Sequence, residues 1–135
     1  MVFARIFIFL LLLYAAPFAN AQNSRSTTIK LLCQNWKIKE LNVVATDAEA
    51  KEDLEDLIKY ARIEFKADMT LIDKTDEFAE EGKWELNKAG DEVTIIFKEG
   101  DKIRLKILSL SSSLFKFKSF DEGSFPSGSL VPAKN

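Results

Sequence analysis

The chain has 135 residues, a formal net charge of −2, a single cysteine and no histidine. The absence of histidine excludes His-dependent catalytic triads and removes both the commonest general base at neutral pH and the commonest zinc ligand. The slightly acidic balance gives no overall attraction to nucleic acid, and the lone Cys33 excludes an intramolecular disulfide.

The N-terminal stretch over 1–21 has the pattern of an export signal. Arg5 precedes an apolar run over 6–16, and Pro17 then leads to the small-x-small site Ala19-Asn20-Ala21. The apolar run is shorter than the about 20 residues that a membrane-spanning helix needs. We therefore expect a cleaved signal peptide, a mature chain without a transmembrane segment, and a periplasmic, cell-surface or secreted location. An exported domain of this size without a disulfide favours a bacterial source.

Residues 22–29 are polar, and we expect a flexible lead-in there to a barrel domain over 30–120. Trp36 and Ile38 share one face of the first predicted strand, but the apolar residues beyond Glu40 have the opposite parity. Such a change of register is typical of a β-bulge, and bulges bend a sheet toward closure.

Residues 46–61 change to a helical period. Thr46 and Glu49 have the spacing of a capping box, so we expect a helix to begin here. The opposite face of this helix is acidic and lacks large aromatic anchors, which favours a packing role over membrane binding. We expect the helix to cover one end of the sheet or barrel. Its apolar stripe follows the i, i+3, i+4, i+7 rule and consists of Leu54, Leu57, Ile58 and Ala61.

The rest of the chain alternates at period two. Residues 62–72 alternate most cleanly and predict one strand, and the acidic loop over 73–81 lacks the ligand order of an EF-hand. Short strands joined by glycine- or serine-rich turns then predict an antiparallel meander over 82–119. Residues 121–135 are rich in Ser, Gly and Pro and predict a tail, in which 130–131 could add a short edge strand.

These elements predict a mainly β fold, a small antiparallel barrel of about six or seven strands with one helix between the first and second strands. The alternative is a cystatin-like α+β roll, which has the same order of strand, helix and meander. That fold would make the protein an inhibitor or a protein-interaction module, but the Q-x-V-x-G loop of such inhibitors is missing. Contact between the first strand and residues 115–119 would favour the closed barrel.

Four short stretches resemble the bacterial lipocalin-like domain, a small calycin-type barrel of exported proteins. The resemblance rests on two tryptophans, Trp36 and Trp84, in fixed strand contexts and on a shared hydrophobic rhythm. It implies a closed antiparallel barrel that serves as a binding or packing module, and it names no ligand. The matching stretches are 32–38, 63–68, 82–86 and 107–117.

The chain departs from that family after Asp68. The family often places a glycine at the next position, where this chain has Met69. If the glycine serves a turn with positive φ, we expect a different local geometry here.

The predicted barrel interior has two interpretations. Its side chains could hold a small apolar ligand, or they could fill the barrel themselves, which is favoured because about eight strands are needed to hold even one small ligand. The interior positions are Trp36, Ile38, Phe65, Met69, Trp84, Leu86, Ile95, Phe97, Leu105 and Phe117.

The outer face gathers cations on neighbouring strands. Such a strip could dock an anionic envelope component, although a solvated face with lysines that discourage edge pairing is favoured. The strip consists of Lys102, Arg104, Lys106, Lys116 and Lys118, with Lys37 and Lys39 extending it if the first strand closes against the last.

Nothing in the sequence predicts catalysis. Cys33 lacks a histidine partner, no carboxylate pair is singled out by its spacing, and no nucleotide-binding glycine motif is present. We therefore expect a non-enzymatic protein with no catalytic residues, no metal site and no cofactor.

Overall fold

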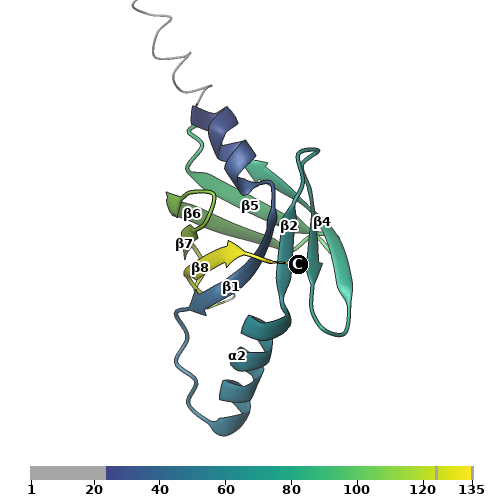
Figure 1. The fold of residues 1–135 in the computed structure, drawn as a ribbon, viewed down its shortest axis with the longest axis vertical. Helices are drawn as coiled ribbons and strands as arrows, with labels where there is room; N and C mark the ends of the chain where they lie inside the picture. The colour runs from purple at the N-terminus through teal and green to yellow at the C-terminus, as the bar shows by residue number, and fades with distance from the viewer. Residues whose placement is uncertain (1–23, 124, 135) are drawn as a thin grey trace, which may run out of the picture.

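The computed structural model describes residues 24–123 and 125–134, so the predicted signal peptide lies outside the described residues. The chain begins there with a helix over 24–32, called the N-terminal helix below (Figure 1). None of the helices in the described ranges has the length and apolar character to cross a bilayer. The elements that follow are β1 (Asn35–Leu41), α2 (Ala48–Tyr60), β2 (Arg62–Phe65), β3 (Thr70–Lys74), β4 (Ala79–Leu86), β5 (Glu92–Phe97), β6 (Lys102–Leu110), β7 (Phe115–Ser119) and β8 (Gly128–Pro132).

The strands form a closed antiparallel barrel in chain order, from β1 to β8. Each strand pairs with the next one, and β8 pairs with both β7 and β1. The register of the β1–β8 pair shifts between Ile38 and Glu40, which confirms the predicted bulge. This closed meander, with α2 between β1 and β2, confirms the predicted fold and is incompatible with the open cystatin-like roll.

The barrel has eight strands rather than six or seven, because residues 62–72 form a hairpin instead of one strand. Phe65 on β2 pairs with Leu71 on β3, and the even spacing between them keeps both side chains inward through the turn. Met69 has a φ of 68° in this turn. The prediction that the turn after Asp68 differs in backbone conformation is therefore wrong. Met69 adopts the left-handed conformation that glycine usually adopts.

Two segments that were expected to be irregular contain strands. β3 and β4 extend into the acidic stretch 73–81, which leaves only residues 75–78 as the turn. β8 lies in the expected tail, but it is paired on both sides and therefore is not an edge strand. The barrel domain consequently extends to Pro132 instead of ending at residue 120.

The N-terminal helix occupies most of the segment that was expected to be a flexible lead-in. It lies at the opposite end of the barrel from α2 (Figure 1). Leu32 is fully buried, and its carbonyl accepts a hydrogen bond of 2.9 Å from the Trp36 indole N–H. Arg25 donates to the Leu86 carbonyl at 3.3 Å. These contacts fix the helix over the end of the barrel where β1 begins.

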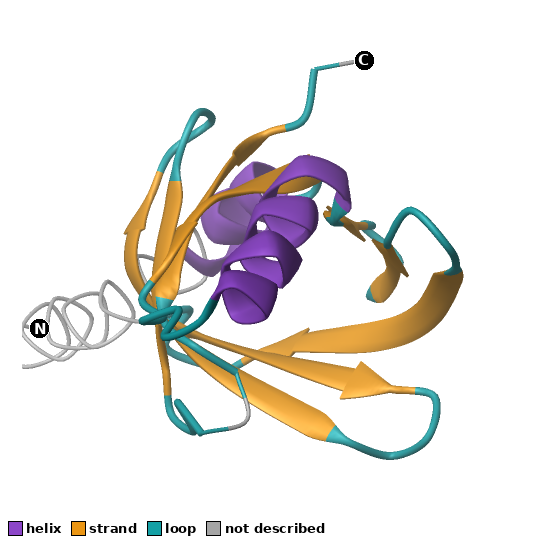
Figure 2. Cartoon of the chain, turned by 90° about the horizontal axis from the view of Figure 1, so that it is seen from below, coloured by secondary structure: helices purple, strands orange, loops and turns teal. Residues whose placement is uncertain are grey.

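α2 lies across the other end of the barrel (Figure 2). Its N-cap is Asp47 rather than Thr46, because the Asp47 carboxylate accepts a hydrogen bond of 2.7 Å from the Ala50 N–H. No residue of α2 is buried, and Leu57 on its apolar stripe is 39% exposed. The helix therefore covers one end as expected, but it does so loosely.

Candidate functional site

The half of the interior next to the N-terminal helix is filled by aromatic rings. Trp36 contacts Phe115 edge to face, with ring centroids 6.0 Å apart, and Phe65 contacts Trp84 in the same way at 5.5 Å. The Trp84 indole N–H donates to the Lys66 carbonyl at 3.0 Å. With both tryptophans buried and hydrogen-bonded, this half is a packed core rather than a ligand site.

The other half, under α2, contains a cavity of about 110 Å³. Strands β1, β2, β3, β5 and β6 supply its walls, and α2 and Phe125 from the β7–β8 connection cover it. Phe125 is held in place by stacking on Phe117, with ring centroids 6.0 Å apart. The lining is apolar except for Asp73 and Thr75. Its apolar members are Ile38, Leu57, Ala61, Ile63, Leu71, Ile95, Phe97, Ile103 and Phe125.

The cavity has the size of a small apolar molecule. An engineered apolar cavity of about 150 Å³ binds benzene, whereas drug-sized ligands occupy about 300–1,000 Å³. Because α2 buries none of its own residues, an outward shift of this helix would enlarge the space and leave the strand pairing of the barrel intact. The site can therefore accept a fragment-sized molecule, or a larger one if α2 moves.

Asp73 is the one charged group in the cavity lining. It lies near the end of β3, directly opposite Glu80 on β4. Burial raises the pKa of the Asp73 carboxyl above its ordinary value, and the neighbouring Glu80 carboxylate raises this pKa further. In the described part of the chain, no lysine or arginine forms an ion pair with either carboxylate. The cavity therefore has an uncompensated acidic group at its edge.

Replacing Asp73 with asparagine should stabilise the protein at pH 7. A carboxyl whose pKa is raised by folding lowers the free energy of unfolding as pH rises from the ordinary aspartate range through the folded-state pKa. The gain should stay below about 1 kcal/mol, because water screens this partly exposed side chain. Denaturant melts of both proteins test this. The gain should vanish near pH 3, below the ordinary aspartate pKa of about 3.9, and a gain that persists there would contradict the electrostatic cause.

The predicted interior residues all belong to one hydrophobic core or pack against it. Eight of them are buried, while Met69 and Phe97 are partly buried against the same cluster. The structure divides all of them except Met69, which lies in the β2–β3 turn, between the two halves of the barrel. The cavity is lined by Ile38, Ile95 and Phe97, and the packed core contains Trp36, Phe65, Trp84, Leu86, Leu105 and Phe117.

Sequence reasoning missed three of the groups that shape the cavity. Asp73 was assigned to a solvated acidic loop, although its even spacing from Leu71 places it on the inward face. Phe125 was assigned to the tail, and Thr75 to the loop. Strand parity could have revealed Asp73, but no local pattern marks Phe125, because its position depends on β8 closing the barrel.

The cations of the predicted outer strip fall into two groups, five on the paired strands β6 and β7 and two on β1. Because β8 lies between β7 and β1, Lys37 is opposite Val131 and Arg62, away from β7. Lys39 lies at the bulge of β1 and is exposed. Only Lys106 and Lys118 face each other directly. Of the remaining cations, Lys102 is opposite Ile96 and Lys116 is opposite Ser109 and Ser129.

Acidic and aromatic side chains also interrupt the strip. Glu92 lies opposite Lys106 and forms an ion pair of 3.7 Å with Arg104. The Arg104 guanidinium also lies over the Phe120 ring, 4.7 Å from its centroid. Because these charges are exposed and partly neutralised, the strip offers only weak attraction to an anionic partner.

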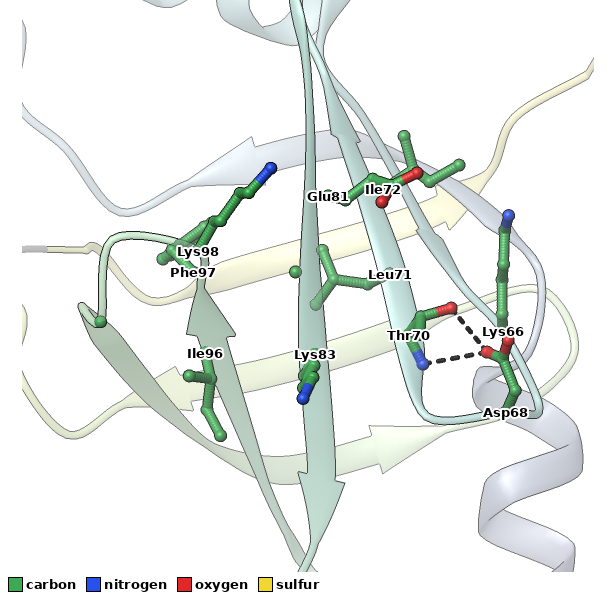
Figure 3. Close-up of a pocket in the computed structure, with 12 residues that line it drawn as sticks. Lys66, Asp68, Thr70, Leu71, Ile72, Glu81, Lys83, Ile96, Phe97 and Lys98 are labelled. Carbon is green, nitrogen blue, oxygen red and sulfur yellow. Dashed lines mark hydrogen bonds between the residues drawn. The ribbon is translucent and has the colours of Figure 1, made fainter.

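A wider hollow of about 700 Å³ lies on the outside of β3, β4 and β5 (Figure 3). Three lysines and two carboxylates line it. The Asp68 carboxylate accepts two hydrogen bonds from Thr70, one from its N–H at 3.0 Å and one from its hydroxyl at 2.5 Å. These hydrogen bonds lower the pKa of Asp68. Within the described residues, no three metal-binding side chains of the His, Cys, Asp or Glu type come together. The hollow is an open groove that carries side chains of both charges.

A closed antiparallel meander barrel, with one end packed and an apolar cavity at the other, is the architecture of a small binding barrel. The model of the lipocalin-like domain matches residues 34–117, so the chain belongs to the lipocalin-like domain family. Searches of curated proteins and of solved structures found no match to the chain. Strand β8 and the N-terminal helix lie outside the matched range.

Proposed function

We propose that this protein is an exported, non-enzymatic binding module of the bacterial envelope that holds a small, mainly apolar ligand under α2. The observation that carries the proposal is the cavity of about 110 Å³ at the loosely covered end of an otherwise packed barrel. Apolar walls with few polar groups are typical of small-molecule sites. The export signal predicted over 1–21 supports a location outside the cytoplasm.

The cavity is a better candidate than the outer strip. Its lining comes from five strands and a helix that all converge on one space, whereas β8 separates the cations of β1 from the rest of the strip and Glu92 partly neutralises the others. The filled-core interpretation applies to the aromatic half of the barrel. A ligand under α2 would contact Leu57 from the helix, Ala61 directly after it and Ile103 from the barrel wall.

A small neutral probe should bind wild-type protein and fail to bind an Ile103→Trp variant. Ile103 is only partly buried and lines the cavity, so a tryptophan at this position would occupy the space that the probe needs. Benzene titrations followed by amide chemical shifts provide the measurement. We expect shift changes at residues that line the cavity, and at least a tenfold loss of affinity in the variant.

Leu108→Trp is the matched control, because Leu108 lies on the same strand and is 50% exposed on the outside of the barrel. This control should bind benzene like the wild type. Shift changes confined to the outer groove of Figure 3, or equal binding by all three proteins, would contradict the proposed site.

A further inference from the structure

We propose that the ligand is a small organic ammonium ion, whose apolar body fills the cavity and whose charged nitrogen is bound by Asp73. This inference rests on the proposed function and assigns the ligand class. The observation behind it is that the mainly apolar lining contains one carboxylate, that of Asp73. An ionised carboxylate is an acceptor only, so the group that best complements it is a cationic hydrogen-bond donor.

Among the described residues, neither carboxylate at the edge of the cavity forms an ion pair. Asp73 and Glu80 are directly opposite each other on neighbouring strands, where like charges repel. Three cations on neighbouring elements make other contacts or point away from the cavity. Arg62 donates to the Ala61 carbonyl at 2.8 Å, Lys59 lies 4.9 Å from the centroid of the Tyr60 ring, and Lys74 is exposed at the parity opposite to Asp73. A bound ammonium ion would supply the missing charge.

The surface beside the cavity is also negatively charged. A hollow of about 300 Å³ beside the cavity shares Leu57, Ala61 and Thr75 with its lining. Its other walls carry four carboxylates, two from α2 and two from the β3–β4 turn, which are Asp53, Asp56, Asp76 and Glu77. A cleft lined by charges of one sign raises the local concentration of ions of the opposite sign. An approaching cation would therefore be concentrated at the α2 end of the barrel.

Other ligand classes fit this chemistry less well. An organic anion would be repelled by Asp73 and by the carboxylates around the opening, and a neutral apolar molecule would leave Asp73 uncompensated. Calcium takes six to eight oxygen ligands, and no group of three metal-binding side chains occurs among the described residues. An ammonium ion needs only one carboxylate and brings the apolar surface that the walls require.

The test compares three probes of nearly equal shape: benzylamine, benzyl alcohol and benzoate. At pH 7 and low salt, wild-type protein should bind benzylamine at least about tenfold more tightly than benzyl alcohol, because the ammonium ion brings a full positive charge to the Asp73 carboxylate and the hydroxyl does not. Benzoate should not bind measurably. In Asp73→Asn the preference for the amine should disappear, because the asparagine side chain can still accept a hydrogen bond but carries no charge. Titration calorimetry and amide chemical shifts give the affinities and the location.

Glu80→Gln should reduce the preference for the amine only in part, because Asp73 remains in place. The matched control is Glu81→Gln, since Glu81 is exposed and has the outward parity next to Glu80. This control should keep the full preference. Equal affinity of the wild type for amine and alcohol would overturn the proposal, and so would a preference that survives in Asp73→Asn. If benzyl alcohol and benzene bind in the cavity but the amine has no advantage, the proposed function stands and only the ligand class is wrong. If none of these probes binds, both fail.

Discussion

Replacing Trp36 with alanine should lower the free energy of unfolding by about 3–5 kcal/mol, the usual effect of deleting a large buried aromatic side chain. Trp36 is fully buried and packs edge to face on Phe115 at 6.0 Å. Its indole N–H also donates to the Leu32 carbonyl at 2.9 Å, which ties the N-terminal helix to the barrel. The substitution therefore leaves a cavity and also releases a helix.

Urea melts measure the loss of stability, and amide hydrogen exchange in residues 24–32 measures the release of the helix. The matched control is Leu108→Ala, because Leu108 is 50% exposed and should change stability by no more than about 0.5 kcal/mol. A loss below about 1 kcal/mol for Trp36→Ala would mean that the aromatic half of the barrel is not a packed core.

The meander could be predicted because its strands obey a local rule. Trp84 and Leu86 alternate with polar residues on β4, and the same period continues through β5, β6 and β7. Both tryptophans are buried in one core, as the pattern predicts. A strand with one solvent-exposed face alternates apolar and polar residues. The strand and its buried face can therefore be predicted without knowing which strands it pairs with.

The elements that escaped prediction depend on distant parts of the chain. The hairpin of β2 and β3 was hidden because its turn keeps the alternation in phase, with Phe65 opposite Leu71. The N-terminal helix has few apolar residues. Leu32 is buried because the helix lies on the end of the barrel, where Trp36 donates a hydrogen bond to the Leu32 carbonyl. Propensity and local pattern are weak guides where tertiary contacts decide the structure.

Only part of the candidate site could be predicted from the sequence, because its other residues are placed by distant parts of the chain. Ile38, Ile95 and Phe97 were placed inside the barrel by their parity, and the structure brings them to one cavity. Asp73 has the same inward parity, but the acidic composition around it outweighed that signal. Whether a barrel interior is packed or hollow depends on how many strands close it and on what covers its ends, and neither quantity is a local property of the sequence.

Replacing Gly128 with alanine should destabilise the barrel by about 3 kcal/mol, at the upper end of the usual effect of overpacking. A Cβ atom at this position would lie 2.3 Å from the Glu40 carbonyl oxygen and 3.0 Å from the Leu41 Cα, and backbone atoms cannot move aside as a flexible side chain can. Gly128 pairs with Leu41 just beyond the bulge in β1. The added methyl group should therefore push β8 away from β1 and open the seam that closes the barrel.

Gly123→Ala is the matched control for this substitution, because its Cβ would meet only a side-chain oxygen of Asp121 at 3.5 Å. It should be neutral, or slightly stabilising through the lower entropy of the unfolded chain. Denaturant melts of the two variants give the difference in stability, and hydrogen exchange shows where it arises. Loss of protection should be concentrated at β8 and at the Asn42 N–H, which donates to the Ser127 carbonyl at 2.7 Å. If Gly128→Ala proves as stable as Gly123→Ala, the close approach of the two backbones at the β1–β8 seam is wrong.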